Sequence, residues 1–234
     1  MRKIISAMVK AIKKFNMISD GDKVAVGLSG GKDSLVLLYA LSEYRKFRNT
    51  NFELIAITID QTNGETDFSK LEELCKTLNV PFYAIKTEIF DIVFNERKEK
   101  NPCSLCAKLR RGTLNSAAKN LGCNKVALAH HVDDYMETFF LSLFYEGRLS
   151  SFAPVTYLSN VDITAIRPLI YVSENDIIQA SKNMPIVKNI CPANRKTKRE
   201  EIKMFLKNLE TQFPNAKKQI KNALLNPERN NLLK

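Results

Sequence analysis

The stretch VAVGLSGGKDSLVLLYAL, residues 24–41, gathers residue types that bind phosphate at a single turn. An apolar, β-branched run comes first, and an apolar run of helical length follows. The turn between them consists of Ser29, Gly30, Gly31, Lys32, Asp33 and Ser34. Two glycines allow the backbone to bring its N–H groups close to an anion, and the helix points the positive end of its dipole at the same place. The pattern predicts a phosphate-binding loop between a strand and a helix.

This loop differs from the two commonest nucleotide-binding motifs. Lys32 is followed by Asp33 instead of Ser or Thr, and Val26 stands where a Walker A loop has its first glycine. A G-x-G-x-x-G fingerprint is absent from the sequence. Because phosphate repels a carboxylate unless a cation lies between them, Asp33 predicts a bridging Mg²⁺ ion. An ordinary turn would explain the glycines but not Ser, Lys, Asp and Ser together.

A second polar cluster lies in ALAHHVDDYMETFF, residues 127–140, and contains both histidines of the chain. His130, His131, Asp133 and Asp134 stand at the carboxyl end of a predicted strand and the opening of a predicted helix. We expect one aspartate to cap that helix. Adjacent strand residues point to opposite faces, so the two imidazoles are poorly placed to share a metal ion. We expect one histidine to face phosphate, while Asp133 or Asp134 helps to hold Mg²⁺ or positions substrate.

The cysteines form a third group. Cys103 and Cys106 stand in NPCSLCAKLRR, residues 101–111, and Cys191 is likewise followed by proline and a basic run. Cys75 and Cys123 occupy apolar-periodic positions and are expected in the core. Five cysteines, without a secretion signal, argue against a disulfide framework.

Three chemistries are open to Cys103, Cys106 and Cys191. A C-x-x-C pair at a helix start also occurs in thioredoxin-like redox motifs, but a redox pair needs no third cysteine. Structural zinc prefers four ligands, and both histidines are assigned to the phosphate side. Three soft ligands with an open corner therefore favour a [4Fe–4S] cluster whose unligated iron can take sulfide. Three thiols without metal are the alternative.

The positive charge is concentrated in two regions. Lys and Arg number 36 against 25 Asp and Glu, a net charge of +11, and residues 181–234 alone carry +9. The second region runs from Arg97 to Arg111. Localised positive charge is typical of polyanion partners such as nucleic acid, although a solvated helix face is the alternative. The candidate contacts are Lys108, Arg110, Arg111, Arg195, Lys196, Lys198 and Arg199.

The elements that would position these residues alternate between strands and helices, which predicts a parallel α/β sheet. Strands are expected at 23–29, 52–60, 81–87 and 124–130, and helices at 33–47, 68–80, 106–122 and 131–147, the last apolar almost all round. A polar loop, a short strand within 163–170 and a helix capped by Ser173, with Asp176 three residues on, should follow. A basic helical tail should begin near Thr197.

The S-G-G-K-D-S loop resembles the SGGxDS loop of the N-type ATP pyrophosphatases, the PP-loop family. These enzymes cleave ATP to AMP and pyrophosphate and activate a carbonyl oxygen by adenylation. The resemblance implies a doubly wound, mostly parallel sheet with ATP at the carboxyl ends of the strands. It also implies that Ile57 and Asp60 lie beside the adenine and ribose, although Asp60 could equally cap a turn.

Five motifs in order narrow the resemblance. They are SGGKDS, CSLCAKLRRG, AHHVDD, IRPL and CPANRKTKREEI. This set resembles the tRNA 2-thiocytidine synthetase group, whose members replace the C2 oxygen of a tRNA cytidine with sulfur. The resemblance implies ATP, Mg²⁺ and a [4Fe–4S] cluster held by Cys103, Cys106 and Cys191. This sequence departs from the pattern of the group at two positions, and both departures concern the identity of the substrate. Lys188 stands where some members have a cysteine, and Ala129 stands where glycine is usual.

The resemblance implies a two-step reaction. The base carbonyl oxygen attacks the α-phosphate and releases pyrophosphate, and sulfur, bound at the open iron or relayed as persulfide, then displaces AMP. Lys32 and Arg167 are expected to stabilise phosphate charge, although Arg167 could instead anchor a loop. Asp33 and Asp133 would complete the catalytic set, and His130, His131 and Asp134 would help to bind the nucleotide. A cysteine desulfurase or free sulfide would supply the sulfur.

Other functions have to be weighed against this one. A thiouridine-forming relative would use the same loop and cluster but carry zinc-binding Cys and His pairs, which are absent. A desulfidase would need no ATP, and the intact SGGKDS motif argues against it. A third possibility is a non-enzymatic nucleotide- or RNA-binding protein with structural zinc. That function would not explain why only three cysteine ligands are available and the fourth coordination position is open.

The predicted domain organisation has three parts. Residues 1–20 would form an amphipathic helix, residues 21–180 the PP-loop domain with the C-x-x-C motif, and residues 181–234 a basic helical extension with the third cluster cysteine. The apolar face of the first helix could pair two protomers in a homodimer or pack on its own domain. With no signal peptide and no run of eighteen apolar residues, a cytoplasmic protein without membrane contact is expected.

Overall fold

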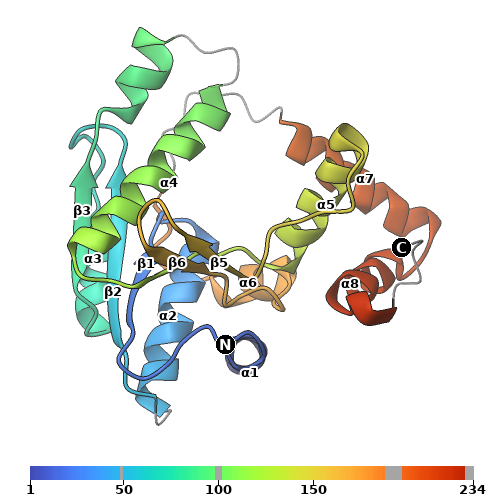
Figure 1. Ribbon diagram of the computed structural model, residues 1–234, viewed down its shortest axis with the longest axis horizontal. Helices are drawn as coiled ribbons and strands as arrows, with labels where there is room; N and C mark the ends of the chain where they lie inside the picture. The colour runs from blue at the N-terminus through green and yellow to red at the C-terminus, as the bar shows by residue number, and fades with distance from the viewer. Residues whose placement is uncertain (48–49, 98–101, 188–196, 230–234) are drawn as a thin grey trace. The chain divides into compact units, whose positions relative to one another are not determined.

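The computed structural model describes residues 1–47, 50–97, 102–187 and 197–229 (Figure 1). The strands are β1 (Lys23–Gly27), β2 (Glu53–Asp60), β3 (Phe82–Lys86), β4 (Lys125–Ala127), β5 (Val155–Leu158) and β6 (Ile163–Ile166). The α-helices are α1 (Arg2–Lys14), α2 (Lys32–Phe47), α3 (Ser69–Thr77), α4 (Pro102–Asn120), α5 (Val132–Glu146), α6 (Glu174–Ala180), α7 (Lys198–Gln212) and α8 (Ala216–Leu225). A π-helix, η1 (Asp91–Glu96), and a 3₁₀ turn, η2 (Pro227–Arg229), complete the described elements.

The described strands form one sheet in the order β3-β2-β1-β4-β6-β5. Neighbouring strands from β3 to β6 are parallel, and β5 runs antiparallel to β6 at the edge. The predicted mostly parallel α/β fold with helical extensions is confirmed. Strand β5 lies in the stretch that was expected to be a polar loop, because its four residues stay partly exposed and give little apolar alternation.

The order of the strands reverses between β1 and β4. From β1 the chain continues to β2 and β3 on one side, while β4, β6 and β5 lie on the other. In an open α/β sheet, the carboxyl ends of the strands beside such a reversal form a ligand-binding crevice. The loops after β1 and β4 are therefore the expected location of a site.

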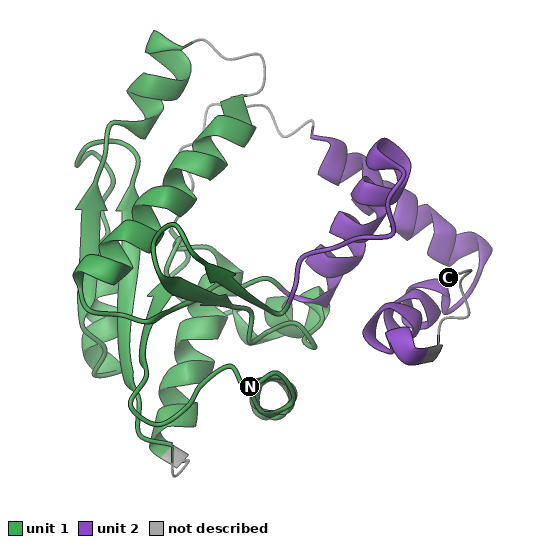
Figure 2. Ribbon diagram, viewed as in Figure 1, with its two compact units in different colours: residues 1–130, 154–193 green, residues 131–153, 194–234 purple. Residues whose placement is uncertain are grey.

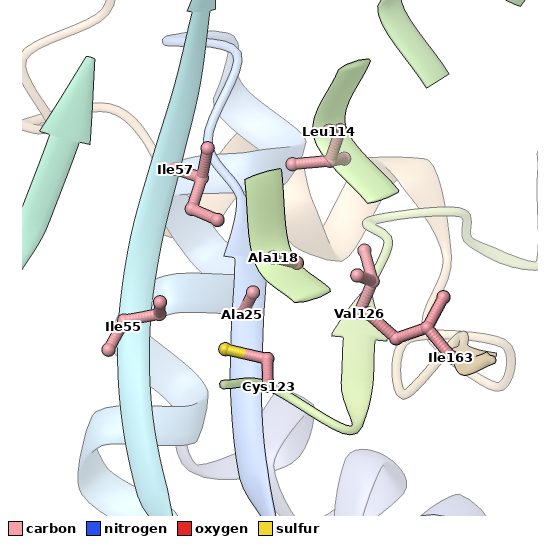
Figure 3. Packing of buried hydrophobic residues seen from close by; sticks show 8 residues of the cluster. All are labelled: Ala25, Ile55, Ile57, Leu114, Ala118, Cys123, Val126 and Ile163. Carbon is pink, nitrogen blue, oxygen red and sulfur yellow. The ribbon is translucent and has the colours of Figure 1, made fainter. Parts of the chain in front are cut away.

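The core of the sheet lies against helices on both faces. Figure 1 shows α4 in front of the sheet and α2 behind it. Figure 3 shows the cluster on the α4 side, and its buried members are Ala25, Ile55, Ile57, Leu114, Ala118, Cys123, Val126 and Ile163. At Gly27, a Cβ atom would lie 2.9 Å from Leu114 Cδ2, so the glycine allows α4 to pack closely against β1.

Helix α4 begins four residues before its predicted start. Pro102 occupies the first helical position, where its missing N–H costs no hydrogen bond. Cys103 therefore lies on the helix instead of before it, three residues from Cys106 and on the same face. The predicted cap of α6 is confirmed, since the Ser173 side chain accepts a hydrogen bond from Asp176 N. Thr197 likewise caps α7.

Helix α5 is less buried than its apolar sequence predicted. Val132 and Met136 are buried, but Phe144 and Tyr145 are 51% and 48% exposed. Its partners in the contact cluster come from α7 and α8, including Ile202 and Leu206. Residues 144–146 at the end of the helix are exposed and most of the others are only partly buried, so α5 is not the buried helix that its apolar sequence predicts.

The chain divides into two compact units (Figure 2). The first unit comprises residues 1–130 and 154–193 and contains the sheet, and the second comprises residues 131–153 and 194–234. Helix α1 belongs to the first unit, where Ile4, Met8 and Ile12 are buried. The apolar face of α1 therefore packs on its own unit and does not remain available to pair two protomers. A homodimer would need another surface. The predicted functional division at residues 20 and 180 stays a prediction.

Membrane-spanning segments were sought among the described helices. None of them is both long enough and apolar enough to cross a bilayer.

Candidate functional site

The first unit brings three predicted site segments to one edge of its sheet. The glycine-rich loop follows β1, Asp60 ends β2, and His130 follows β4. Strands β2, β1 and β4 are adjacent and parallel, so their carboxyl ends lie side by side. Helix α4 runs back across this sheet, and its first turns lie at the same edge, where Cys106 contacts Gln61. The predicted nucleotide loop and the C-x-x-C motif therefore share one edge.

The loop after β1 is organised by its two serines. Ser34 Oγ accepts a hydrogen bond from Ser29 N at 3.2 Å and donates one to Gly31 O at 2.9 Å. Ser29 Oγ lies 3.1 Å from Ser34 Oγ and accepts from Gly31 N at 3.4 Å. These contacts hold the turn in shape before any ligand binds. Backbone N–H groups at a helix start are suited to phosphate oxygens.

Gly30 is required by both conformation and space. Its φ angle is +77°, and a Cβ atom would lie 2.9 Å from Val187 Cβ. Val187 N also donates to Gly30 O at 3.0 Å. The described chain therefore touches the phosphate loop four residues before Cys191 in the sequence, and Cys191 itself lies outside the described residues.

Replacing Gly30 with alanine is expected to destabilise the protein by about 1–2 kcal/mol, because alanine is strained at positive φ and its Cβ would contact Val187. Thermal and urea unfolding measure the effect. Gly112→Ala is the matched control, since a Cβ there meets open space on a helix and should stabilise by about 0.5–1 kcal/mol. Unchanged stability of Gly30→Ala would contradict the loop geometry.

Lys32 is held by two carboxylates. Its Nζ lies 3.0 Å from Asp33 Oδ1 and 3.3 Å from Glu174 Oε1 at the start of α6. Burial alone lowers the pKa of Lys32, but the charges and hydrogen bonds of Asp33 and Glu174 outweigh burial and raise it above its usual value. Lys32 is therefore a fixed positive charge beside the loop. Sequence reasoning missed Glu174, because an acidic residue in the first turn of a helix is common without function.

The residues predicted to meet the adenine and ribose have structural partners. Asp60 Oδ1 accepts hydrogen bonds from Thr62 N at 2.9 Å and from Thr62 Oγ1 at 2.7 Å, and Asp60 Oδ2 accepts from Gly64 N. These are the contacts of a turn cap. The side chain of Ile57 packs in the core cluster. Contacts of either residue with ATP stay predictions.

The two described cysteines of the predicted ligand set differ in environment. Cys103 is exposed, while Cys106 is 8% exposed and packs with Ile89 and Val93. Cys106 Sγ donates a hydrogen bond to Gln61 Oε1 at 3.1 Å. Two thiols on one helix face fit two of the three legs of a cluster, and the positive end of the helix dipole favours the negative charge of thiolates.

The third leg of that cluster is outside the structural description. Among the described residues, no three His, Cys, Asp or Glu side chains come close enough together to hold a metal ion. Because Cys191 is not described, the three-cysteine set stays a prediction. The four described cysteines form no disulfide.

Alkylation distinguishes the cysteines in the metal-free protein. Burial, with Glu72 nearby, raises the pKa of Cys75 to about 12, and burial raises that of Cys123 to about 11. At about pH 8, iodoacetamide is expected to label Cys103 and to spare Cys75 and Cys123, of which about one in a thousand or fewer would be thiolate. Peptide mass spectrometry reads the result, and urea-unfolded protein is the control. Equal labelling of Cys103 and Cys123 would contradict the burial.

Arg167 lies after β6 in the first unit. Its guanidinium donates to Thr156 Oγ1 at 3.1 Å, and its backbone N–H donates to Pro154 O. Burial lowers the pKa of Arg167, and the positive charge of Arg111 from α4 lowers it further. Both predicted roles stay predictions, since the Thr156 contact anchors the β5–β6 hairpin while the combined positive charge of Arg167 and Arg111 attracts an anion.

In the second unit, His131 and Asp134 start helix α5. His131 N donates to Asp134 Oδ2 at 3.0 Å, and Asp134 N donates to His131 Nδ1 at 3.4 Å, which is a capping box with His131 as the N-cap. An aspartate was expected to cap this helix, but the N-cap residue is His131 and Asp134 completes the capping box from the third helical position. Asp133 Oδ2 lies 3.8 Å from His131 Nδ1. Nucleotide or Mg²⁺ contacts of these residues and of His130 stay predictions.

The residues predicted to contact RNA differ in exposure and in the partners that their side chains already have. Lys108 and Arg111 are exposed on α4, and Arg110 is partly buried. Arg199 is engaged within its unit, 3.1 Å from Asp134 Oδ1 and 3.1 Å from Thr138 Oγ1. Lys198 Nζ lies over the ring of Tyr145, 4.0 Å from its centroid. Arg195 and Lys196 are outside the described residues.

Comparison with known proteins identifies a family for this arrangement. Residues 3–213 match the PP-loop domain family. The tRNA-cytidine(32) 2-sulfurtransferase of Citrifermentans bemidjiense is 40% identical over 96% of this chain and 90% of the relative. That of Aliivibrio salmonicida is 41% identical over 88% of this chain and 68% of the relative.

Comparison with solved structures supports the same family. The U34-tRNA thiolase NcsA from Methanococcus maripaludis, solved with its [4Fe–4S] cluster, aligns with a TM-score of 0.73 and 25% identity over 96% of this chain and 78% of that chain. The NH3-dependent NAD synthetase of Campylobacter jejuni subsp. jejuni NCTC 11168, in complex with the nitrate ion, aligns with a TM-score of 0.51 and 19% identity over 100% and 98%, which shows the fold alone. The chain belongs to the PP-loop family and, within it, to the tRNA-cytidine(32) 2-sulfurtransferases.

Proposed function

We propose that the protein is an ATP-dependent tRNA sulfurtransferase that replaces the C2 oxygen of a cytidine with sulfur. The observation that carries this proposal is the contact of Cys106 with Gln61, because it brings the C-x-x-C helix to the sheet edge that holds the SGGKDS loop. A shared edge allows one base to meet both ATP and sulfur. The family relationship supports the same reaction.

In the first step the loop would bind the phosphates of ATP. The backbone N–H groups of residues 29–34 and the α2 dipole favour the negative charge. Lys32 would exchange its contact with Asp33 for a phosphate oxygen while Glu174 keeps its ammonium in place. Asp33, released from Lys32, would hold Mg²⁺, whose oxygen ligands it can supply. The C2 oxygen attacks the α-phosphorus, and pyrophosphate leaves.

In the second step the activated C2 carbon receives sulfur and AMP leaves with the original oxygen. A [4Fe–4S] cluster, when bound by Cys103, Cys106 and Cys191, supplies the site that carries the sulfur. Water competes for the same carbon, so local delivery of sulfur and a shielded site are needed. The apolar side chains around Cys106, which include Ile89 and Val93, would limit the access of water.

Transfer RNA would be held mainly through its phosphates. Lys108 and Arg111 are exposed on the helix that carries the two cysteines, so contacts there would bring the RNA backbone to the site. The target base must leave any stack to reach it. A cytoplasmic location, a homodimer and the identity of the sulfur donor stay predictions.

A reconstitution assay tests the function. Anaerobically reconstituted protein is incubated with Mg·ATP, unmodified tRNA and either sulfide or cysteine with a cysteine desulfurase and a dithiol reductant, which supplies the two electrons that persulfide sulfur needs, and the RNA is digested to nucleosides. Mass spectrometry is expected to find 2-thiocytidine and one AMP for each sulfur incorporated. Formation of thiouridine instead would show that the substrate base is uridine and not cytidine. Loss of sulfur from thiolated tRNA without ATP would show that the protein is a desulfidase. No thionucleoside despite an intact cluster and bound tRNA would overturn the proposal.

A further inference from the structure

We propose that Gln61 is a positioning residue for Cys106, whose side-chain amide donates a hydrogen bond to the Cys106 sulfur when that sulfur is a thiolate ligand. This inference rests on the proposed function in one respect, the role of Cys106 as a cluster ligand. It assigns a role to a side chain outside every motif that the sequence singled out.

The contact itself is direct and long-range. Cys106 Sγ and Gln61 Oε1 lie 3.1 Å apart, although the residues are 45 positions apart in the chain. A thiol donates to the amide oxygen, whereas a thiolate has no proton and can only accept. Because the amide carries an acceptor and two donors, Gln61 can serve both states by turning its terminal group over.

The turn that carries Gln61 is fixed on several sides. The carboxylate of Asp60 accepts hydrogen bonds from Thr62 and Gly64, and Asp60 O accepts from Thr87 N at 2.9 Å. Gln61 O accepts from Phe90 N at 3.3 Å. A side chain on such a turn loses little further freedom when it makes a contact, so its hydrogen bond can set the position of a ligand.

The surroundings of Cys106 increase the effect of this amide. Ile89 and Val93 form a buried cluster with Cys106, and Leu105 and Leu109 pack against that cluster. A hydrogen bond is electrostatically stronger where water is excluded. Partners of metal ligands in such a shell orient the ligand and tune the metal, and their loss costs about 10–100-fold in metal affinity.

The proposal predicts two measurable changes in the reconstituted protein. Hydrogen bonds to cluster sulfurs are among the determinants of the reduction potential, since they stabilise the more negative, reduced state. Gln61→Leu keeps the approximate size and removes the amide, so the midpoint potential should fall. Iron release to a chelator should become about tenfold faster.

The experiment compares four reconstituted proteins. Wild type, Gln61→Leu, Gln61→Asn and Gln179→Leu are reconstituted anaerobically, and iron release, midpoint potential and thermal unfolding are measured for each. Asparagine is one methylene too short to make the 3.1 Å contact, so it should behave like leucine and provides a second variant if leucine impairs folding. Gln179 is exposed on α6, and its replacement should change nothing.

The outcomes separate the inference from the function. Wild-type iron release and potential in both Gln61 variants, with a normal cluster and normal thiolation, would overturn the inference and leave the function intact. Faster iron loss with an unchanged potential and a lower melting temperature would also overturn it, because that is a structural role. If the wild-type protein thiolates tRNA without binding a cluster, the cluster is not part of the proposed function. The inference about Gln61 is then overturned as well.

Discussion

Replacing Cys106 with alanine is expected to reduce sulfur transfer to tRNA at least about 100-fold, because the loss of a ligand should cost more than the 10–100-fold loss of a ligand's partner. ATP binding should be unchanged, since Cys106 lies on α4 and the phosphate loop lies between β1 and α2. The measurement is 2-thiocytidine formed per enzyme, beside equilibrium binding of ATP. The visible cluster absorption should be lost together with the activity.

Cys123→Ala is the matched control for this variant. Cys123 is 2% exposed in the core cluster beneath α4 and is at least as deeply buried as Cys106. Its replacement should lower the free energy of unfolding by about 1 kcal/mol, the size of a typical mutation, and leave the cluster and thiolation in place. Full thiolation by Cys106→Ala, or loss of the cluster from Cys123→Ala, would refute the assignment of the ligands.

The second large effect is expected from Lys32→Gln. This change removes the fixed positive charge beside the phosphate loop, and the rate of pyrophosphate release in the presence of tRNA should fall about 100- to 1,000-fold, as for other preorganised charge-stabilising donors. A coupled pyrophosphate assay gives the rate. The variant should fold, because the hydrogen bonds of Ser29, Gly31 and Ser34 hold the loop without the lysine side chain.

Lys46→Gln is the matched control for Lys32→Gln. Lys46 is also paired with a carboxylate, Glu43 Oε1 at 2.8 Å, but its side chain is exposed in the last turn of α2. Exposed pairs of this kind contribute less than about 1 kcal/mol, so the control should retain its activity. Wild-type pyrophosphate release by Lys32→Gln would exclude a catalytic role for the loop lysine.

The sequence determined the fold class because the local patterns agree with the tertiary arrangement. Apolar strands that alternate with amphipathic helices predict a parallel sheet, and β1 to β4, α2, α3, α5 and α6 lie where these patterns stand. It failed at α4, whose start was placed at the amphipathic run although Pro102 sets it, and at β5, whose edge position gives no periodic signal. It also overestimated the burial of α5, since burial depends on how many neighbours a helix has.

The chemistry was likewise only partly readable from the sequence. Glycine, serine and lysine types at fixed spacing identify the phosphate loop, and paired cysteines identify the C-x-x-C site, because both depend on residues close in the chain. The partners of these residues come from distant segments. Glu174 reaches Lys32, Gln61 reaches Cys106, and Arg111 influences Arg167, and none of these pairs has a sequence signature.

There is a physical reason why the sequence determined some of these features and the tertiary structure determined the others. Backbone conformation and helix or strand periodicity are set by neighbouring residues, so the sequence alone specified the phosphate loop, most of the helices and the family. Which distant side chain faces a given lysine or thiol depends on strand order and on how a helix crosses the sheet. The tertiary structure alone decided that Gln61 faces Cys106 and that a carboxylate from α6 holds Lys32.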